Sequence, residues 1–489
     1  MLKYEESRRV YERSARLILL LALRDVCPGA TVRIEHSIGY GVYMNVAGVK
    51  LSAALVRSIE QKMREITEQD LPIVKSRWTR EQAIAYFAAQ GQADTVRLLE
   101  YRPFDHFDVY TCDGLSEYFY GDMAASTGEI RQFALRFYYP GMVLLLPGDD
   151  LAGAPAPFAE RPQLMRTYAE ANEHSRILQC ESAADLNDII ARGDARMFIR
   201  VNEALQERAI AQIAERIIAR GTRVVFIAGP SSSGKTTFAN RLSIQLRVSG
   251  KCPKAISLDD YYRNRNEVPL GPDGAPDLEC LESIDVPLFN EQLIELLDGR
   301  EVELPRYSFK TKRREEKGVP MQLLKDDILI VEGIHGLNDK LSCDIPSELK
   351  FRVYVSALTQ LNLDCHNRIR TTDVRLMRRM VRDNRTRATD ALQTLQMWDS
   401  VRAGEEKYMF PFQEKADVMF NTSLLYEIAV LKKYAYPMLS AIGPESPYYT
   451  RARRLCKFLH YFKDLDEESE IPPTSILREF IGGCSFYDE

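Results

Sequence analysis

A stretch in the middle of the chain has the residue types and spacing to bind phosphate. Residues 229–236 read Gly-Pro-Ser-Ser-Ser-Gly-Lys-Thr and fit the pattern G-x-x-x-x-G-K-[ST] without a gap. In this pattern the glycines let backbone N–H groups point at phosphate oxygens, the lysine reaches the terminal phosphates, and the last hydroxyl binds Mg²⁺. We therefore expect a nucleoside triphosphate to bind Gly229, Pro230, Ser231, Ser232, Ser233, Gly234, Lys235, Thr236 and Thr237.

The residues on both sides of this loop have the patterns of a buried strand and a helix. Residues 224–228 form a short apolar run rich in β-branched side chains, and residues 238–248 suit a helix. The helix N-terminus would bring its partial positive charge to the phosphates. A glycine-rich turn with a surface lysine is the alternative, and the strand and helix around the loop argue against it.

Apolar runs alternate with helical patterns through the second half of the chain. The runs are residues 224–228, 255–258, 328–331, 351–355 and 418–420. This alternation predicts an α/β fold with a mainly parallel sheet covered by helices. Ligands in such folds bind at the carboxyl ends of the strands, so the polar residues that follow each run are the candidates for chemistry.

Acidic residues follow two of these runs. Asp259 and Asp260 end the second run, and Glu332 follows the third. A carboxylate that faces a phosphate loop from a neighbouring strand is where Mg²⁺ would be organised. An Asp-Asp pair in isolation would be read as a helix cap or a solvated turn, and the phosphate loop favours the functional interpretation.

A basic helix face follows later in the sequence. Arg375, Arg378, Arg379 and Arg382 are spaced i, i+3, i+4 and i+7, so one face presents four like charges. Unpaired charges would repel one another, and a polyphosphate ligand would relieve the repulsion. A solvated face is the alternative, and the net charge of −5 makes an RNA backbone the weaker counterpart.

Length and composition indicate a folded chain of several parts. The 489 residues are 45% hydrophobic and 28% charged, which predicts two or three globular domains. We expect an α+β domain over 1–150, a helical connector over 151–220, the α/β domain over 221–445, and helices without assigned chemistry over 446–489. The apolar residues 17–23 fit a buried amphipathic helix better than a signal peptide, because acidic residues precede them.

Cysteine spacing and hydropathy favour a reducing, cytoplasmic compartment for this protein. The nine cysteines form no C-x-x-C pair, so neither a zinc ribbon nor a disulfide framework is indicated. No apolar run approaches membrane-spanning length. We expect a cytoplasmic protein with no membrane partner, and the sequence leaves a homo-oligomer open.

Several segments of the second half resemble, in order, the motifs of the uridine kinase and phosphoribulokinase family. They are residues 229–236, Ser-Leu-Asp-Asp-Tyr-Tyr at 257–262, Leu-Pro-Arg-Tyr-Ser-Phe at 304–309, Ile-Val-Glu-Gly-Ile at 330–334 and Arg-Leu-Met-Arg-Arg at 375–379. The resemblance runs from about residue 222 to 435, and residues 405–412 resemble the long bacterial nucleoside kinases. It implies a P-loop kinase that uses ATP and Mg²⁺ to phosphorylate the 5'-hydroxyl of a nucleoside, with a pyrimidine nucleoside as the expected acceptor.

The resemblance also implies a role for individual residues. Asp259 matches the general base, and Thr236, Glu332 and Asp259 match the metal site. Lys235, Arg382 and Arg387 match the cations that neutralise the transferring phosphoryl group. The positions that match the nucleoside pocket are Glu279, Tyr307, Phe309, Lys312 and Arg379.

The expected pocket departs from the family pattern. Glu279 stands where aspartate is usual, Leu278 replaces an aromatic residue, and Lys312 replaces a base-reading histidine. Lysine offers only hydrogen-bond donors, so a Lys312 that faces the base would favour a carbonyl at the pyrimidine 4-position, as in uridine or thymidine. In the alternative, Lys312 points into solvent beside its basic neighbours.

The front of the chain resembles the second N-terminal domain of threonyl-tRNA synthetase, which edits mischarged tRNA. The similar runs are residues 32–43, 71–76 and 109–114. That family's editing site uses a His-x-x-x-His pair on the first helix and a later Cys-x-x-x-His pair. Here the first helix has no histidine, and Ser116 follows Cys112 where the second histidine belongs. We interpret the domain as an inactive scaffold, with His36 and His106 as packed or surface residues.

Two other functions stay open. The chain could be a kinase for another small alcohol, since the family's architecture serves several acceptors. It could also be a regulator that uses nucleotide binding as a switch while the front half binds RNA or a partner protein. Asp259 argues against a pure switch, because a switch needs no base aimed at an acceptor.

Overall fold

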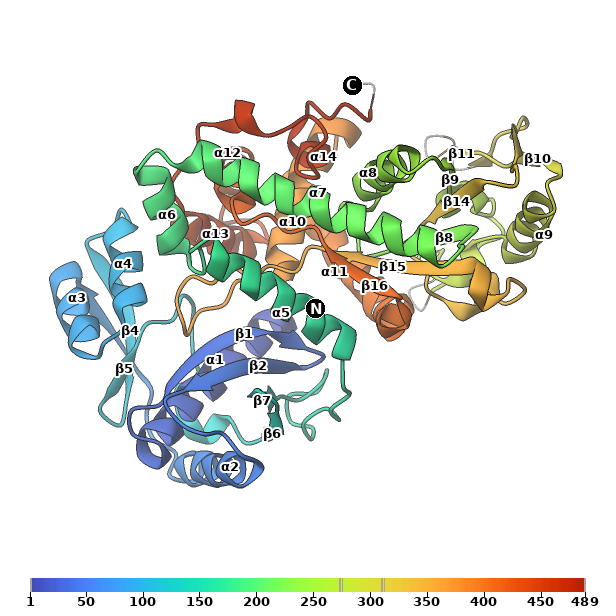
Figure 1. Cartoon of the computed structure of the whole chain (residues 1–489). Helices are drawn as coiled ribbons and strands as arrows, with labels where there is room; N and C mark the ends of the chain where they lie inside the picture. Colours follow the sequence, from blue (N-terminus) through green and yellow to red (C-terminus); the bar gives the residue numbers. More distant parts are fainter. Residues whose placement is uncertain (1, 272–273, 275, 309–310, 312, 488–489) are drawn as a thin grey trace.

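The structure, a computed structural model, describes residues 2–271, 274, 276–308, 311 and 313–487 (Figure 1). Among the expected site residues, Phe309 and Lys312 lie outside the described residues. No helix in the described part of the chain has the length and apolar composition needed to span a membrane.

A five-stranded parallel sheet forms the centre of the second half. Its strands are β8 (Val224–Ala228), β9 (Cys252–Ser257), β14 (Asp327–Glu332), β15 (Lys350–Ser356) and β16 (Val418–Asn421). They lie in the order β16-β15-β8-β14-β9 and every neighbouring pair is parallel. The predicted fold class and all five predicted strands are therefore confirmed, and β8 takes the central position.

The central strand is apolar throughout because both faces of the sheet are covered. Val224 and Phe226 point into a core that includes Leu293 of α9 (Val286–Leu297). Val225 and Ile227 point into a second core, which includes residues of α7 (Ala195–Ala219) and α8 (Lys235–Val248). Figure 1 shows α7 and α8 running across the sheet. Burial on both sides is typical of parallel sheets and removes the usual polar alternation from the strand.

Two antiparallel ribbons extend the edge of this domain near β9. The first pairs β10 (Glu301–Leu304) with β13 (Val319–Gln322). The second pairs β11 (Tyr307–Ser308) with β12 (Arg313–Arg314). The sequence analysis did not predict these ribbons, whose strands are only two to four residues long.

The front of the chain is an α+β region with two antiparallel sheets. A four-stranded sheet has the order β1-β2-β7-β6, and a three-stranded sheet has the order β3-β4-β5. Their strands are β1 (Thr31–Ile38), β2 (Gly41–Ala47), β3 (Val74–Thr79), β4 (His106–Cys112), β5 (Leu115–Glu117), β6 (Ala134–Tyr138) and β7 (Gly141–Leu145). The helices are α1 (Leu2–Val26), α2 (Ala53–Glu68), α3 (Arg80–Ala89) and α4 (Ala93–Tyr101). The α+β region expected at the front of the chain thus contains two separate sheets.

The burial expected for residues 17–23, which lie on helix α1, is confirmed. Residues 17–23 are all buried and belong to the core of the front region. His36 is also packed, stacked on Tyr168 with ring centroids 3.6 Å apart, whereas His106 is exposed. Both histidines therefore have the ordinary surroundings that the sequence analysis expected.

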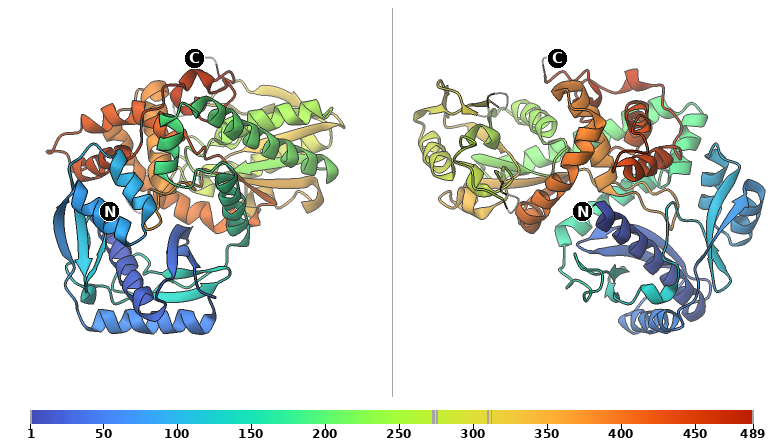
Figure 2. Two further views of the ribbon diagram at one scale, coloured as in Figure 1. Left: turned by 60° about the vertical axis from the view of Figure 1, so that its left-hand side comes forward. Right: turned by 180° about the vertical axis from the view of Figure 1, so that it is seen from behind.

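Helices join the front of the chain to the sheet domain. The connector consists of α5 (Pro162–Ile177), α6 (Ala183–Ala191) and α7, and the helices after β15 are α10 (Thr371–Arg387), α11 (Ala391–Tyr408), α12 (Glu427–Ser440), α13 (Tyr449–Leu459) and α14 (Arg478–Ile481). One continuous core contains side chains from β4, from the connector, from α10 and from the C-terminal helices. Figure 2 shows the blue N-terminal part and the red C-terminal helices against each other.

Buried ion pairs fix the start of α10 between the two ends of the chain. Asp373 lies within 2.8 Å of Arg9 on α1 and within 2.7 Å of Arg454 on α13. Glu12 on α1 lies 3.1 Å from Arg368, just before α10. Burial raises the pKa of Asp373, but the two arginines lower it by more. The pKa of this carboxyl is therefore well below its usual value.

We expect Asp373→Asn to lower the free energy of unfolding by about 3–5 kcal/mol, because it leaves two buried arginines without their carboxylate. Chemical denaturation with circular dichroism measures the change. Glu173→Gln is the control, since its pair with Arg176 is more than half exposed on both sides and contributes little. A loss below about 1 kcal/mol for Asp373→Asn would contradict the role of this ion pair.

Candidate functional site

The loop between β8 and α8 is folded tightly, and its two glycines are required by its surroundings. A Cβ atom on Gly229 would lie 1.9 Å from the carbonyl oxygen of Val355 on the neighbouring strand. Gly234 has φ +84° and ends the loop just before α8. A Cβ there would lie 2.6 Å from Cγ2 of Ile476. The backbone can therefore curl against its neighbours only where no side chain is present.

Lys235 and Thr236 begin α8 beside the carboxylate of Glu332. The Thr236 hydroxyl lies 3.1 and 3.0 Å from the two carboxylate oxygens of Glu332, and the Lys235 ammonium donates to the Pro230 carbonyl at 3.3 Å. Burial raises the pKa of Glu332 to about 7, although Lys235 and the Thr236 hydroxyl lower it. A hydroxyl next to a partly buried carboxylate is an oxygen donor set of the kind that Mg²⁺ prefers.

Asp259 lies at the end of β9, close enough to Lys235 for their charges to interact. Burial raises the pKa of Asp259, and Lys235 and Arg387 lower it. Asp260 faces another way and accepts a hydrogen bond from the backbone N–H of Tyr307 at 3.3 Å. The structure therefore separates the two aspartates, with one toward the phosphate loop and the other toward the ribbon of β11.

A cleft opens beside the loop, between α8 and the ribbon of β10 and β13. Its volume is about 440 Å³. The lining includes Thr236, Glu332, Asn240, Asp260, Leu304 and Arg306. Two of the three predicted metal residues, Thr236 and Glu332, thus line an open space, whereas Asp259 is not part of its lining.

The residues expected to bind the acceptor nucleoside include a second acidic side chain, Glu279. Burial raises the pKa of Glu279 to about 7, and repulsion from Glu405 adds to the effect while Arg379 opposes it. Gly404 on α11 allows the close approach, since a Cβ there would lie 2.7 Å from Cγ of Glu279. The ring of Tyr307 lies 5.6 Å from that of Tyr262, between centroids. The structure thus shows Glu279, Tyr307 and Arg379 in electrostatic or packing contact with the region around Asp259.

The basic face of α10 is paired with protein carboxylates, so the premise that its four charges are left unpaired is wrong. Arg375 is fully buried against Glu405 of α11, and Arg378 is fully buried against Glu427 of α12. Arg379 and Arg382 both pair with Asp383, at 3.2 and 2.9 Å. The solvated face is excluded as well, because the two buried pairs hold α10 against its neighbouring helices.

Arg387 differs from these four. Its side chain is 56% exposed, its pair with Asp383 is 3.6 Å long, and it lies near enough to Asp259 to lower the pKa of that carboxyl. The two arginines predicted to act on phosphate thus lie near the loop, since Arg387 interacts electrostatically with Asp259 and Arg382 with Lys235.

Ser231 in the phosphate loop is held by three side chains from the helices above it. Its N–H donates to Glu405 at 2.8 Å, its carbonyl accepts from Arg375 at 3.0 Å, and its hydroxyl accepts from Arg379 at 2.7 Å. Sequence analysis missed Glu405 as a site residue. The resemblance of residues 405–412 to long nucleoside kinases was the one available signal.

The C-terminal segment also reaches the loop, which the sequence did not indicate. The Thr237 hydroxyl donates to Glu479 at 2.7 Å and lies 3.2 Å from the hydroxyl of Tyr487. Glu479 is in turn 3.7 Å from Arg382. Residues near the C-terminus thus contact the same side chains that were expected to bind nucleotide.

The two remaining positions of the editing-like motif do not converge. Cys112 is buried in the apolar core of the front region, and its burial raises its pKa to about 11. Ser116 pairs across the hairpin with Thr111, and their hydroxyls are 2.7 Å apart. Neighbouring strand residues point to opposite faces, so Cys112 and Ser116 lie on opposite sides of the hairpin.

Comparisons with known proteins match the sheet domain. Residues 224–428 match the model of the phosphoribulokinase / uridine kinase family. The chain is 27% identical over 197 residues to a uridine kinase of Lactobacillus johnsonii, covering 40% of this chain and 84% of that protein. It is 25% identical over 212 residues to a uridine kinase of Staphylococcus aureus, covering 43% and 93%. A solved structure of a candidate uridine kinase from Bacillus stearothermophilus is 22% identical, covers 43% of this chain and 97% of that chain, and has a TM-score of 0.30.

Proposed function

From the premise that residues 224–428 form a domain of the phosphoribulokinase / uridine kinase family, we propose that this protein is an ATP-dependent nucleoside kinase. It would transfer the γ-phosphate of ATP to the 5'-hydroxyl of a nucleoside, with a pyrimidine nucleoside as the expected substrate. The observation that carries the proposal is the position of Lys235, which begins α8 and interacts electrostatically with both Glu332 and Asp259. The Lys235 ammonium group thus lies near the phosphate loop, near the proposed metal ligand Glu332 and near the proposed base Asp259.

Each group has a role in this transfer. Thr236 and Glu332 would hold Mg²⁺, which shields charge on the triphosphate when it is bound. Asp259 accepts the proton of the acceptor hydroxyl as that oxygen forms a bond to the γ-phosphorus and the bond to ADP breaks. Lys235, Arg382 and Arg387 offset the negative charge that develops on the transferring group. Glu279 would accept hydrogen bonds from ribose hydroxyls, and Tyr307 would form a wall for the base.

A nucleoside screen tests the proposal. Purified protein is incubated with Mg²⁺, γ-labelled ATP and single nucleosides, and the labelled nucleoside 5'-monophosphate is the expected product. Transfer of the label to a different small alcohol would mean that the protein is a kinase with another acceptor. ATP binding without transfer to any acceptor would favour the nucleotide-controlled switch instead, with the front half as its binding part.

We expect the acceptor pocket to prefer uridine or thymidine over cytidine by about tenfold in kcat/KM, the value of roughly one hydrogen bond. The reason is Lys312, which can donate to a carbonyl oxygen and cannot accept from an amino group. Initial rates with each nucleoside measure the preference, and Lys312→Gln should reduce it, because glutamine can both donate and accept. Equal or faster turnover of cytidine would show that Lys312 does not read the base.

We expect the affinity for Mg²⁺·ATP to fall by about tenfold per pH unit below pH 7, because Glu332 must lose its proton to bind a cation. The sign follows from its pKa, which burial raises to about 7, so the carboxyl is mostly protonated below that pH and mostly charged above it. Calorimetric titrations between pH 5 and pH 9 measure the affinity. Glu332→Gln should bind more weakly and show a flatter pH dependence, and an unchanged slope in that variant would assign the dependence to another group.

The net charge of −5 leaves nucleic acid disfavoured as a partner. For the front of the chain we propose a scaffold without editing chemistry, supported by the burial of Cys112 and the separation of Cys112 from Ser116.

A further inference from the structure

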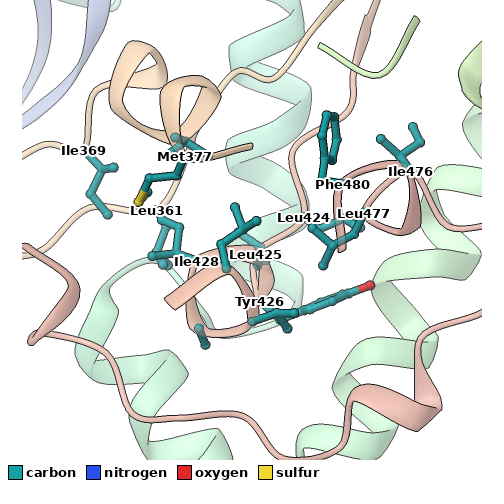
Figure 3. Close-up of a cluster of buried hydrophobic side chains, with 14 of the residues drawn as sticks. Leu361, Ile369, Met377, Leu424, Leu425, Tyr426, Ile428, Ile476, Leu477 and Phe480 are labelled. Carbon is teal, nitrogen blue, oxygen red and sulfur yellow. The ribbon is translucent and has the colours of Figure 1, made fainter. Parts of the chain in front are cut away.

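The C-terminal segment is anchored firmly beside the phosphate loop. Ile476, Leu477 and Phe480 are fully buried, and they pack in a cluster with Leu424 and Tyr426 (Figure 3). The cluster also contains Met377 of α10. Ser475 adds a buried polar contact, a hydrogen bond of 2.6 Å to Glu203 on α7. The backbone around α14 is therefore part of the folded core and cannot leave the site without breaking that packing.

From this anchored position, Glu479 extends its side chain into the nucleotide site. Its carboxylate accepts from the Thr237 hydroxyl at 2.7 Å and lies 3.7 Å from the guanidinium of Arg382. The backbone carbonyl of the same residue accepts from Arg385 at 3.3 Å. The side chain is 11% exposed, so water screens these interactions only weakly.

The partners of Glu479 are groups that a triphosphate would need. Thr237 directly follows the phosphate-loop pattern, and Arg382 is one of the expected phosphoryl-binding cations. A threonine hydroxyl has one proton, so Thr237 cannot donate to Glu479 and to a phosphate oxygen at the same time. A carboxylate next to a polyphosphate would also be repelled by it.

We propose that residues 475–487 form a wall of the nucleotide site, and that Glu479 occupies the place of a phosphate group until a polyphosphate displaces its side chain. The inference rests on the proposed function only in requiring that the loop binds nucleotide. Because the backbone of α14 is held by the apolar cluster, displacement means a change of the Glu479 side-chain rotamer. A site that must first release its own carboxylate binds its ligand more weakly than one that need not.

Direct binding to the full chain tests this proposal without any turnover. Mg²⁺·ATP and inorganic tripolyphosphate are titrated calorimetrically into the wild type and Glu479→Gln at fixed ionic strength. We expect Glu479→Gln to bind both ligands about tenfold more tightly, because a neutral amide competes less for Thr237 and Arg382. Glu470→Gln is the matched control. Glu470 lies shortly before this segment and pairs with Arg196 and Arg200 on α7, so the variant should leave both affinities unchanged.

The two ligands separate the alternatives. Weaker binding of ATP with unchanged tripolyphosphate would make Glu479 a ligand of the ribose and overturn the proposal. Unchanged or weaker binding of both ligands would overturn it as well, as would binding of neither ligand to either protein. Thermal unfolding shows whether Glu479→Gln is folded. If that variant does not fold, Glu479→Asp replaces it, since aspartate keeps the charge but has a shorter side chain. We expect Glu479→Asp to bind both ligands about threefold more tightly than the wild type. Tight ATP binding without phosphoryl transfer would refute the proposed kinase activity and leave this inference standing.

Discussion

Asp259→Asn is expected to lower the rate of phosphoryl transfer by about a thousandfold while Mg²⁺·ATP still binds. Asparagine has nearly the same shape as aspartate but cannot accept the proton of the attacking hydroxyl. The position supports this role, because Asp259 lies partly buried beside the phosphate loop and interacts with both Lys235 and Arg387. Loss of its charge should therefore affect the chemical step far more than nucleotide binding.

Single-turnover transfer to the acceptor found in the nucleoside screen measures this effect, and ATP affinity is measured separately. Asp260→Asn is the matched control, since the adjacent carboxylate accepts from the Tyr307 N–H and points toward the ribbon. We expect the control to lose less than about tenfold in rate. Equal losses in both variants would mean that the two aspartates act through folding or acceptor binding. An unchanged rate for Asp259→Asn would show that Asp259 is not the general base.

The sheet could be predicted from the sequence because its strands are short apolar runs with polar boundaries. Residues 224–228 and 328–331 are buried on both faces, so their composition alone identifies them. The phosphate loop could be predicted because its glycines, lysine and threonine have a characteristic spacing within eight consecutive residues. The ribbons could not, since strands as short as Tyr307–Ser308 carry no periodicity.

Contacts between distant parts of the chain were beyond sequence reasoning. The spacing of Arg375 and Arg378 placed them correctly on one helix face, but it could not show that Glu405 and Glu427 neutralise them. Nor could the terminal sequence show that Glu479 reaches Thr237, which lies 242 positions earlier. The local sequence determines which face of a helix is basic, whereas tertiary packing determines which residues that face contacts.

Helix α1 shows the same limit. The prediction that residues 17–23 lie on a buried amphipathic helix is confirmed, since all of them are buried. Polar side chains of α1 are buried too, and they are used at the junction with the sheet domain, where Arg9 meets Asp373 and Glu12 meets Arg368. The sequence could not show that these charged side chains pair with α10 and with the loop before it. These pairs connect the front of the chain to α10.

Lys235→Met is expected to reduce kcat/KM by about a thousandfold and also to shift the pH dependence of the remaining activity. Methionine has similar volume and no charge, so the variant removes the cation that would contact the terminal phosphates. It also removes a charge that lowers the pKa of Asp259 and the pKa of Glu332. Both carboxyls should therefore titrate at higher pH in the variant.

The sign of that shift distinguishes this role from simple loss of binding. A base must be unprotonated to act, so the acidic limb of the rate profile should move toward higher pH in Lys235→Met, because its carboxyls keep their protons longer. Rates at saturating ATP across pH 5 to pH 9 measure the limb. Lys325→Met is the control, since Lys325 is exposed just before β14, at the end of that strand away from the loop, and should change neither rate nor profile. A large loss of activity with no shift of the acidic limb would mean that Lys235 contacts phosphate but does not set the charge of Asp259 and Glu332.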